Sequence, residues 1–210
     1  MNADDLGLSE GVNAGIVEAH EHGIVTSASL MVRRPAAGAA ATAVGHHPSL
    51  AIGLHLELDD WVGGGESGIE RECREQLDAF RLLLGRDPTH VDSHHHVHMG
   101  EPVASVVERL SEELGVPLRG WRIRYEGGFH GRSADGEPWP HGIGVDHLLA
   151  LVESQPEGWT ELGCHPGLGV DAGSSYGRER EDEVRTLCDA RVRVAIEDQG
   201  VELRSFAQFS

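Results

Sequence analysis

Leu-Ala-Ile-Gly-Leu-His-Leu-Glu-Leu, residues 50–58, alternates apolar with small or polar side chains, which predicts a strand. Residues 69–84 predict an amphipathic helix, because apolar residues such as Leu77 and Phe80 recur there at helical spacing. Residues 89–93, Thr-His-Val-Asp-Ser, predict a second strand. A strand, a helix and another strand in succession indicate a parallel βαβ unit.

The same alternation continues towards both ends of the chain. Further helices are expected over residues 12–22, 35–46, 102–114, 145–154 and 178–199, and further strands over residues 25–32, 116–121, 159–164 and 201–206. Residues 124–142 are rich in glycine, proline and polar residues and predict a long loop. The pattern indicates an α/β fold with a parallel sheet, either a barrel or an open doubly wound sheet. With 210 residues, we expect a single domain over residues 1–210.

The charged residues are unusual in kind as well as in number. The chain has 35 acidic residues against 17 basic ones, all arginine, and a formal net charge of −18. The absence of lysine excludes Schiff-base chemistry and the lysines of phosphate-binding loops and kinases. The negative charge disfavours nucleic acids and anionic membranes as partners, and it favours a neutral or cationic small-molecule substrate.

The cysteines and the amino end bear on localisation. Cys73, Cys164 and Cys188 lie far apart, which fits neither a disulfide framework nor a thiolate zinc site. The acidic residues 1–5 do not resemble a signal peptide, and no apolar stretch is long enough to span a membrane. We therefore expect a cytoplasmic protein, whose oligomeric state, homo-oligomer included, the sequence leaves open.

Polar clusters lie where three strands are expected to end, the edge at which parallel α/β proteins carry their functional residues. Asp4 and Asp5 are adjacent carboxylates, a pair that by itself also fits a solvated turn or a helix cap. His55 lies near the carboxyl end of its strand, and a histidine alone there also fits a structural role. Residues 92–98, Asp-Ser-His-His-His-Val-His, follow the next strand, and an extended course would point alternate side chains the same way.

Taken together, the clusters indicate more than each does alone. One carboxylate and two imidazoles from three strand ends make a three-ligand metal site with open positions for water and substrate. The second carboxylate could act as a base on a water molecule there. Two more residues are candidates: His165, which follows an expected strand and could be an acid or oxyanion stabiliser, and Arg119, which follows Val-Pro-Leu at 116–118 and could orient a carboxylate or form a surface ion pair.

Five segments in order resemble the YdjC-type carbohydrate deacetylases, the family of the chitooligosaccharide deacetylase ChbG and the hopanoid-associated HpnK proteins. The resemblance runs from residue 2 to about residue 205. The segments are Asn-Ala-Asp-Asp-Leu-Gly-Leu-Ser at 2–9, Gly-Ile-Val-Thr-Ser at 23–27, Gly-Leu-His-Leu at 53–56, Thr-His-Val-Asp-Ser-His-His-His-Val-His at 89–98 and Cys-His-Pro at 164–166.

The resemblance implies a distorted (β/α) barrel of the polysaccharide-deacetylase type and hydrolysis of the N-acetyl group of an acetylated amino sugar. It implies Asp5, His55 and His94 as ligands of one divalent metal ion, either Zn²⁺ or Mg²⁺. It also implies Asp4 as the base and His165 as the acid. Two further residues, Asp92 and His98, would support the ligands or contact substrate, and Arg119 joins them as a candidate.

One departure from the family pattern stands out: an apolar strand should precede the first motif, and only Met1 does. The barrel is therefore expected to lack its first strand or to be open there. Three rival interpretations remain at this stage. They are a non-haem iron oxygenase with one carboxylate and two histidines, an amidohydrolase-type barrel using His94 and His96, and a barrel that binds sugar or metal without turnover.

Overall fold

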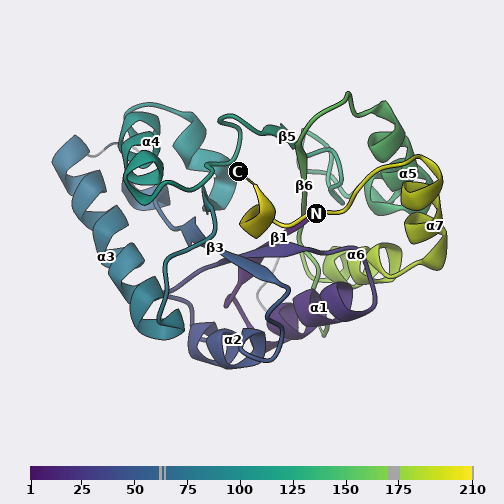
Figure 1. The fold of residues 1–210 in the computed structure, drawn as a ribbon, viewed down its shortest axis with the longest axis horizontal. Helices are drawn as coiled ribbons and strands as arrows, with labels where there is room; N and C mark the ends of the chain where they lie inside the picture. The colour runs from purple at the N-terminus through teal and green to yellow at the C-terminus, as the bar shows by residue number, and fades with distance from the viewer. Residues whose placement is uncertain (62, 64, 170–175, 210) are drawn as a thin grey trace.

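A curled sheet of parallel strands organises the protein, as the computed structural model of residues 1–61, 63, 65–169 and 176–209 describes it (Figure 1). The strand order is β4-β3-β2-β1-β6-β5. The strands are β1 (Asn2–Leu6), β2 (Ser27–Leu30), β3 (Ala51–Leu56), β4 (Val91–Ser93), β5 (Arg124–Glu126) and β6 (Thr160–Cys164). Because neighbouring strands run parallel, their carboxyl ends meet at one edge.

Helices connect the strands and cover the outer side of the sheet (Figure 1). They are α1 (Glu10–Glu21), α2 (Ala37–Val44), α3 (Glu66–Leu84), α4 (Val103–Leu114), α5 (Val145–Ser154), α6 (Arg178–Leu187) and α7 (Ala190–Asp198). Helix α1 packs between α2 and α6, and α3 packs between α2 and α4. The α/β fold with a parallel sheet, predicted from the alternating pattern, is confirmed. Among the described helices, none combines the length and apolar character that crossing a lipid bilayer requires.

Strand β1 corrects the expectation that the first strand is missing. Residues Asn2–Leu6 are themselves that strand, and they lie in the middle of the sheet between β2 and β6. The polar sequence hides the strand because three of its five buried side chains are Asn2, Asp4 and Asp5. Buried polar side chains are tolerated only where partners satisfy them, and a single strand does not display its partners.

Three other elements also differ from the sequence prediction. Residues 116–121 form no regular strand, and Leu118 makes isolated bridges to Val91 and Arg122. Strand β5 lies inside the expected loop, where its Arg-Tyr-Glu sequence lacks an apolar alternation. Residues 201–205 are irregular and lead into a short 3-10 helix at Phe206–Gln208 instead of forming a strand.

The long carboxyl-terminal helix expected over residues 178–199 is two helices. Helix α6 ends at Leu187, and α7 begins after Asp189, whose side chain accepts a hydrogen bond from the Arg191 backbone N–H. An aspartate in an extended conformation is a strong helix N-cap. The charged pattern on either side is helical, so the periodicity alone does not reveal the break.

Candidate active site

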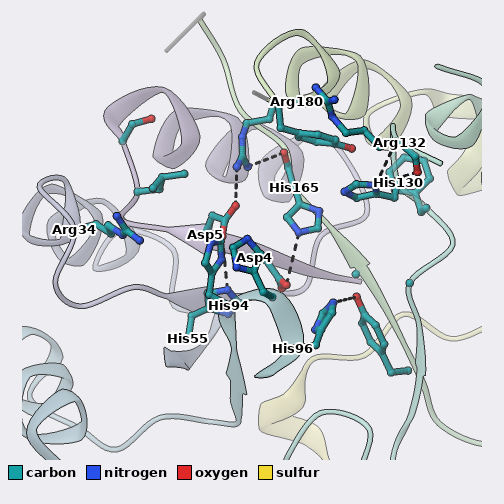
Figure 2. Close-up of a pocket in the computed structure, with 18 residues that line it drawn as sticks. Asp4, Asp5, Arg34, His55, His94, His96, His130, Arg132, His165 and Arg180 are labelled. Carbon is teal, nitrogen blue, oxygen red and sulfur yellow. Dashed lines mark hydrogen bonds and ion pairs between the residues drawn. The ribbon is translucent and has the colours of Figure 1, made fainter. Parts of the chain in front are cut away.

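A cavity of about 1130 Å³ opens at the carboxyl ends of the strands (Figure 2). Asp4 and Asp5 lie at the end of β1, and His55 lies near the end of β3. His94 directly follows β4, and His165 directly follows β6. All five line this cavity, so the fold brings together the principal site residues singled out in the sequence.

Asp5, His55 and His94 face one another in the cavity (Figure 2). Asp5 Oδ1 lies 3.6 Å from His55 Nε2 and 3.4 Å from His94 Nδ1. One ligand atom from each residue lies within 4.8 Å of the other two. Asp5 Oδ1 is buried and has no hydrogen-bond partner among the described residues, a costly state for a carboxylate oxygen unless a cation contacts it. These residues therefore fit a divalent metal ion with one oxygen and two nitrogen ligands.

Left-handed backbone conformations direct the side chains around this site. Asp5 has a φ of 66°, and the consecutive residues His95 and His96 have φ values of 52° and 55°. Residues with a Cβ seldom adopt this region, and such strain is concentrated at functional sites. The turn at His95 and His96 ends the extended course expected for residues 92–98, so the prediction that alternate side chains there point the same way is wrong.

The histidines after His94 consequently have different surroundings. His95 Nδ1 lies 2.5 Å from Asp59 Oδ1 at the exposed edge of the cavity. His96 lines the cavity. His98 is buried outside it, with Nδ1 2.6 Å from Ser93 Oγ and Nε2 3.2 Å from the carbonyl oxygen of Arg119. His98 therefore connects the end of β4 to the backbone at Arg119. It does not line the cavity.

Arg119 fills the space between Asp4 and Asp92, which together with His55 could otherwise hold a cation. Its Nη1 and Nη2 each donate to an oxygen of Asp4 at 2.6 Å, and Nη2 lies 2.9 Å from Asp92 Oδ2. Its Nε donates to Glu161 at 2.8 Å. Burial acts to lower the pKa of Arg119, but these carboxylates outweigh it and hold the pKa well above its ordinary value. A permanent guanidinium thus occupies this position, which leaves the Asp5 cluster as the candidate metal site.

His55 is oriented from behind by Asp92. His55 Nδ1 lies 2.7 Å from Asp92 Oδ1, and Ser29 Oγ donates to Asp92 Oδ2 at 2.6 Å. Burial acts to lower the pKa of His55, but Asp92 outweighs it and the pKa rises to about 9. A carboxylate on one ring nitrogen directs the other towards a metal ion, which would displace the proton on binding. Asp92 therefore orients His55, one of the candidate metal ligands.

Asp4 and His165 lie on the other side of the cavity. Asp4 Oδ2 lies 3.9 Å from His165 Nε2, and Asn2 Nδ2 donates to Asp4 Oδ1 at 2.9 Å. Burial acts to raise the pKa of Asp4, but Arg119 outweighs it and the pKa falls below its ordinary value. Burial lowers the pKa of His165 to about 4. At neutral pH the cavity thus holds an ionised carboxylate beside a neutral imidazole.

Helix α6 supplies two residues that the sequence interpretation missed. Arg180 Nη2 donates to Asp5 Oδ2 at 2.6 Å, and Glu183 Oε2 accepts a hydrogen bond from the His165 backbone N–H at 2.5 Å. Both are buried on the face of α6 that also carries Val184 and Leu187. A signal was present: two ionisable residues share the helical spacing of apolar ones, which is unusual unless each has a buried partner.

The protein-family comparison matches the family described as YdjC-like protein over residues 1–68 and 64–198. A carbohydrate deacetylase from Geobacillus stearothermophilus is 35% identical, with 100% of this chain and 96% of that protein covered. A chitooligosaccharide deacetylase from Serratia marcescens is 32% identical, with 98% of this chain and 96% of that protein covered. The resemblance drawn from the sequence motifs is confirmed.

Solved structures agree on the fold. A protein from Enterococcus faecalis V583, named as a candidate cellobiose-phosphate cleavage protein, matches with a TM-score of 0.87 at 26% identity, covering 100% of this chain and 97% of that one. A polysaccharide deacetylase from Bacillus cereus matches with a TM-score of 0.58 at 12% identity, covering 100% and 91%. The second likeness concerns the fold alone, and it confirms the predicted polysaccharide-deacetylase type.

Proposed function

The chain belongs to the YdjC-like protein family, and on that premise we propose that it is a metal-dependent carbohydrate N-deacetylase. It hydrolyses the N-acetyl group of an acetylated amino sugar such as a chitooligosaccharide and releases acetate. Relatives named as carbohydrate and chitooligosaccharide deacetylases support this substrate class. The observation that carries the proposal is the cluster of Asp5, His55 and His94 directly beside Asp4 in one cavity.

Asp5, His55 and His94 would hold the divalent ion, whose chemistry there is to polarise the acetyl carbonyl and to acidify a water molecule. Asp5 Oδ1, which faces the two histidines and has no hydrogen-bond partner in the described part of the structure, supports this ligand set. Two imidazoles favour Zn²⁺ or a similar transition ion over Mg²⁺, because nitrogen donors suit the softer ion.

Asp4 is the proposed base. Its carboxylate is ionised at neutral pH, and Arg119 fixes both of its oxygens. As the water oxygen bonds to the acetyl carbon, Asp4 takes up one of the water protons. Arg119 thus positions the base rather than reacting itself.

His165 is the proposed acid. Its Nε2 lies 3.9 Å from Asp4 Oδ2, close enough for a proton to pass between the two groups once they approach. When the carbon–nitrogen bond breaks, the proton passes from Asp4 by way of His165 to the leaving amine nitrogen. One water molecule is consumed, and the products are one acetate ion and one protonated amine, which together carry both protons of the water.

The test is acetate release from N-acetylglucosamine oligomers by chelator-treated protein, before and after addition of Zn²⁺ or Mg²⁺. We expect release only with added metal, and no dependence on dioxygen. Tight metal binding without acetate release from any acetylated amino sugar would overturn the proposal.

The rival interpretations find less support. The case for a barrel without turnover rested on a missing first strand, and Asn2–Leu6 forms that strand. The oxygenase ligand pattern usually accompanies antiparallel folds, whereas the strand pairings here are parallel. An amidohydrolase-type site using His94 and His96 conflicts with the left-handed turn, since His96 belongs to no candidate ligand group among the described residues.

A further inference from the structure

Arg180 bridges two parts of the site that lie far apart in the sequence (Figure 2). Its Nη2 donates to Asp5 Oδ2 at 2.6 Å, and its Nη1 donates to the His165 carbonyl oxygen at 3.1 Å. Its own carbonyl oxygen accepts a hydrogen bond from the Gly167 N–H at 3.2 Å. The side chain is almost fully buried, and its guanidinium carbon lies 5.6 Å from the ring centre of Tyr176. Because Nη1 and Nη2 of this buried guanidinium are both hydrogen-bonded, the group cannot turn away from Asp5 without losing hydrogen bonds.

These contacts divide the two oxygens of Asp5 between two tasks. Oδ2 is engaged by Arg180, while Oδ1 has no hydrogen-bond partner among the described residues and faces His55 and His94. The carboxylate therefore presents one oxygen to the candidate metal position.

Building on the proposed function, we propose that Arg180 is a positioning residue of the metal site. It holds Asp5 as a ligand through Oδ1 alone and ties that ligand to the loop that carries His165. Helix α6 thereby sets the metal affinity, although none of its residues lies in the candidate ligand set.

Charge and orientation have opposite effects on metal affinity, which makes the proposal testable. Without the positive charge of Arg180, the site would attract a divalent cation more strongly. Removing the hydrogen bond would free Asp5 to rotate, and lost ligand support of this kind typically weakens metal binding about 10- to 100-fold. Weaker binding in a neutral variant therefore reports lost orientation.

The experiment is calorimetric titration of Zn²⁺, and separately of Mg²⁺, into chelator-treated full-length protein. We expect Arg180→Gln to raise the metal Kd about 10- to 100-fold. Arg180→Lys keeps the charge but loses the guanidinium that reaches both Asp5 and the His165 carbonyl oxygen. We expect it to raise the metal Kd by a smaller factor. Arg178→Gln, an exposed position on the same helix, is the matched control and should leave the Kd unchanged.

A second comparison separates positioning from a general effect on folding. In an Asp5→Asn background, Arg180→Gln should change the metal Kd less than twofold. The carboxylate whose orientation Arg180 controls is then already absent. Thermal unfolding of each metal-free variant identifies any that fails to fold. If Arg180→Gln fails to fold, the metal Kd of Arg180→Lys tests the proposal instead.

The outcomes distinguish this inference from the function on which it rests. Wild-type binding with an unchanged or lower Kd in both Arg180 variants would overturn the positioning role and leave the deacetylase proposal standing. A wild-type protein that bound neither ion would overturn the metal site and the inference together.

Discussion

Asp4 and Asp5 are neighbours in sequence, yet they have different contacts, which match the different roles proposed for them. Asp4 is held by Arg119 through both oxygens, whereas Asp5 has one oxygen that finds no hydrogen-bond partner within the described part of the chain and lies beside two histidines. The Arg119 guanidinium contacts the first carboxylate at both oxygens, whereas Arg180 contacts the second at Oδ2 alone and leaves Oδ1 facing the two histidines. Which aspartate takes which proposed role therefore follows from contacts with residues distant in the chain. These contacts cannot be read from the Asp-Asp sequence itself.

Replacement of the base should separate chemistry from metal binding. Asp4→Asn removes the proton acceptor but preserves side-chain shape, so we expect turnover to fall by about 10²- to 10⁴-fold while the metal stays bound. The measurements are acetate release and metal content of the same preparation. Near-normal turnover in a folded variant would refute Asp4 as the base.

Replacement of a ligand should do the reverse. His55→Ala removes one of the two imidazoles that approach Asp5 Oδ1, so we expect the purified variant to retain little or no metal by elemental analysis. His95→Ala is the matched control, since His95 is a neighbouring histidine that pairs with Asp59 instead, and its metal content should stay at the wild-type level. Equal metal content in both variants would rule out His55 as a ligand.

The residues that the sequence could not identify are those whose role depends on tertiary contacts. His55 and His94 were predictable because a strand end followed by a polar residue is a local pattern. Arg180 and Glu183 lie in a helix with many charges, where only the packed face shows which ones are buried. Arg119 was noted as a possible carboxylate partner, but its simultaneous contacts with Asp4, Asp92 and Glu161 join separate strands.

Among the elements, the helices were more predictable than the strands. The apolar spacing in α3 and α4 repeats over several turns and stays visible despite charged neighbours. Strands β1 and β5 are short and polar, and their hydrogen bonds are made to partners distant in the chain. Strand prediction therefore failed where polar side chains, buried in β1 but exposed or half-buried in β5, replaced the alternating apolar pattern.

Helix α1 lies directly against the loop that follows β6, and glycine makes this approach possible. A Cβ on Gly15 would clash with the Gly167 backbone, two residues after His165. We expect Gly15→Ala to displace the loop, to lower the free energy of unfolding by about 1–3 kcal/mol and to reduce turnover. Urea denaturation and acetate release measure the two effects.

Gly38 is the control for that substitution, because it lies in helix α2 with open space around its Cβ position. Gly38→Ala should leave the free energy of unfolding unchanged or raise it by up to about 1 kcal/mol, because the position lies in the first turn of α2 and an added Cβ meets no neighbour. Destabilisation of similar size in both variants would contradict a specific contact at Gly15.

For the whole molecule, His90 links the centre of the sheet to the carboxyl-terminal segment. Its ring stacks on Phe206 with centroids 4.0 Å apart, and its Nε2 lies 3.0 Å from Ser29 Oγ. Burial lowers the pKa of His90 to about 4, with the neighbouring Asp92 offsetting only part of the shift. The folded protein thus keeps this histidine neutral at pH values where an unfolded chain would protonate it.

The acid sensitivity of the fold should follow from this residue. Between the ordinary histidine pKa of about 6.5 and the folded value of about 4, the unfolded chain binds the extra proton, so the free energy of unfolding falls as pH falls. The contribution is fully present above pH 6.5, and its loss by pH 4 approaches about 3 kcal/mol.

His90→Gln should therefore reduce the difference in unfolding free energy between pH 7 and pH 4 by about that amount, measured by urea denaturation with chelator present. His98 and His165 titrate in both proteins, so the difference isolates His90, and exposed His46→Gln should leave the pH dependence as in the wild type. The same pH dependence in His90→Gln and wild type would mean that the fold does not hold His90 neutral.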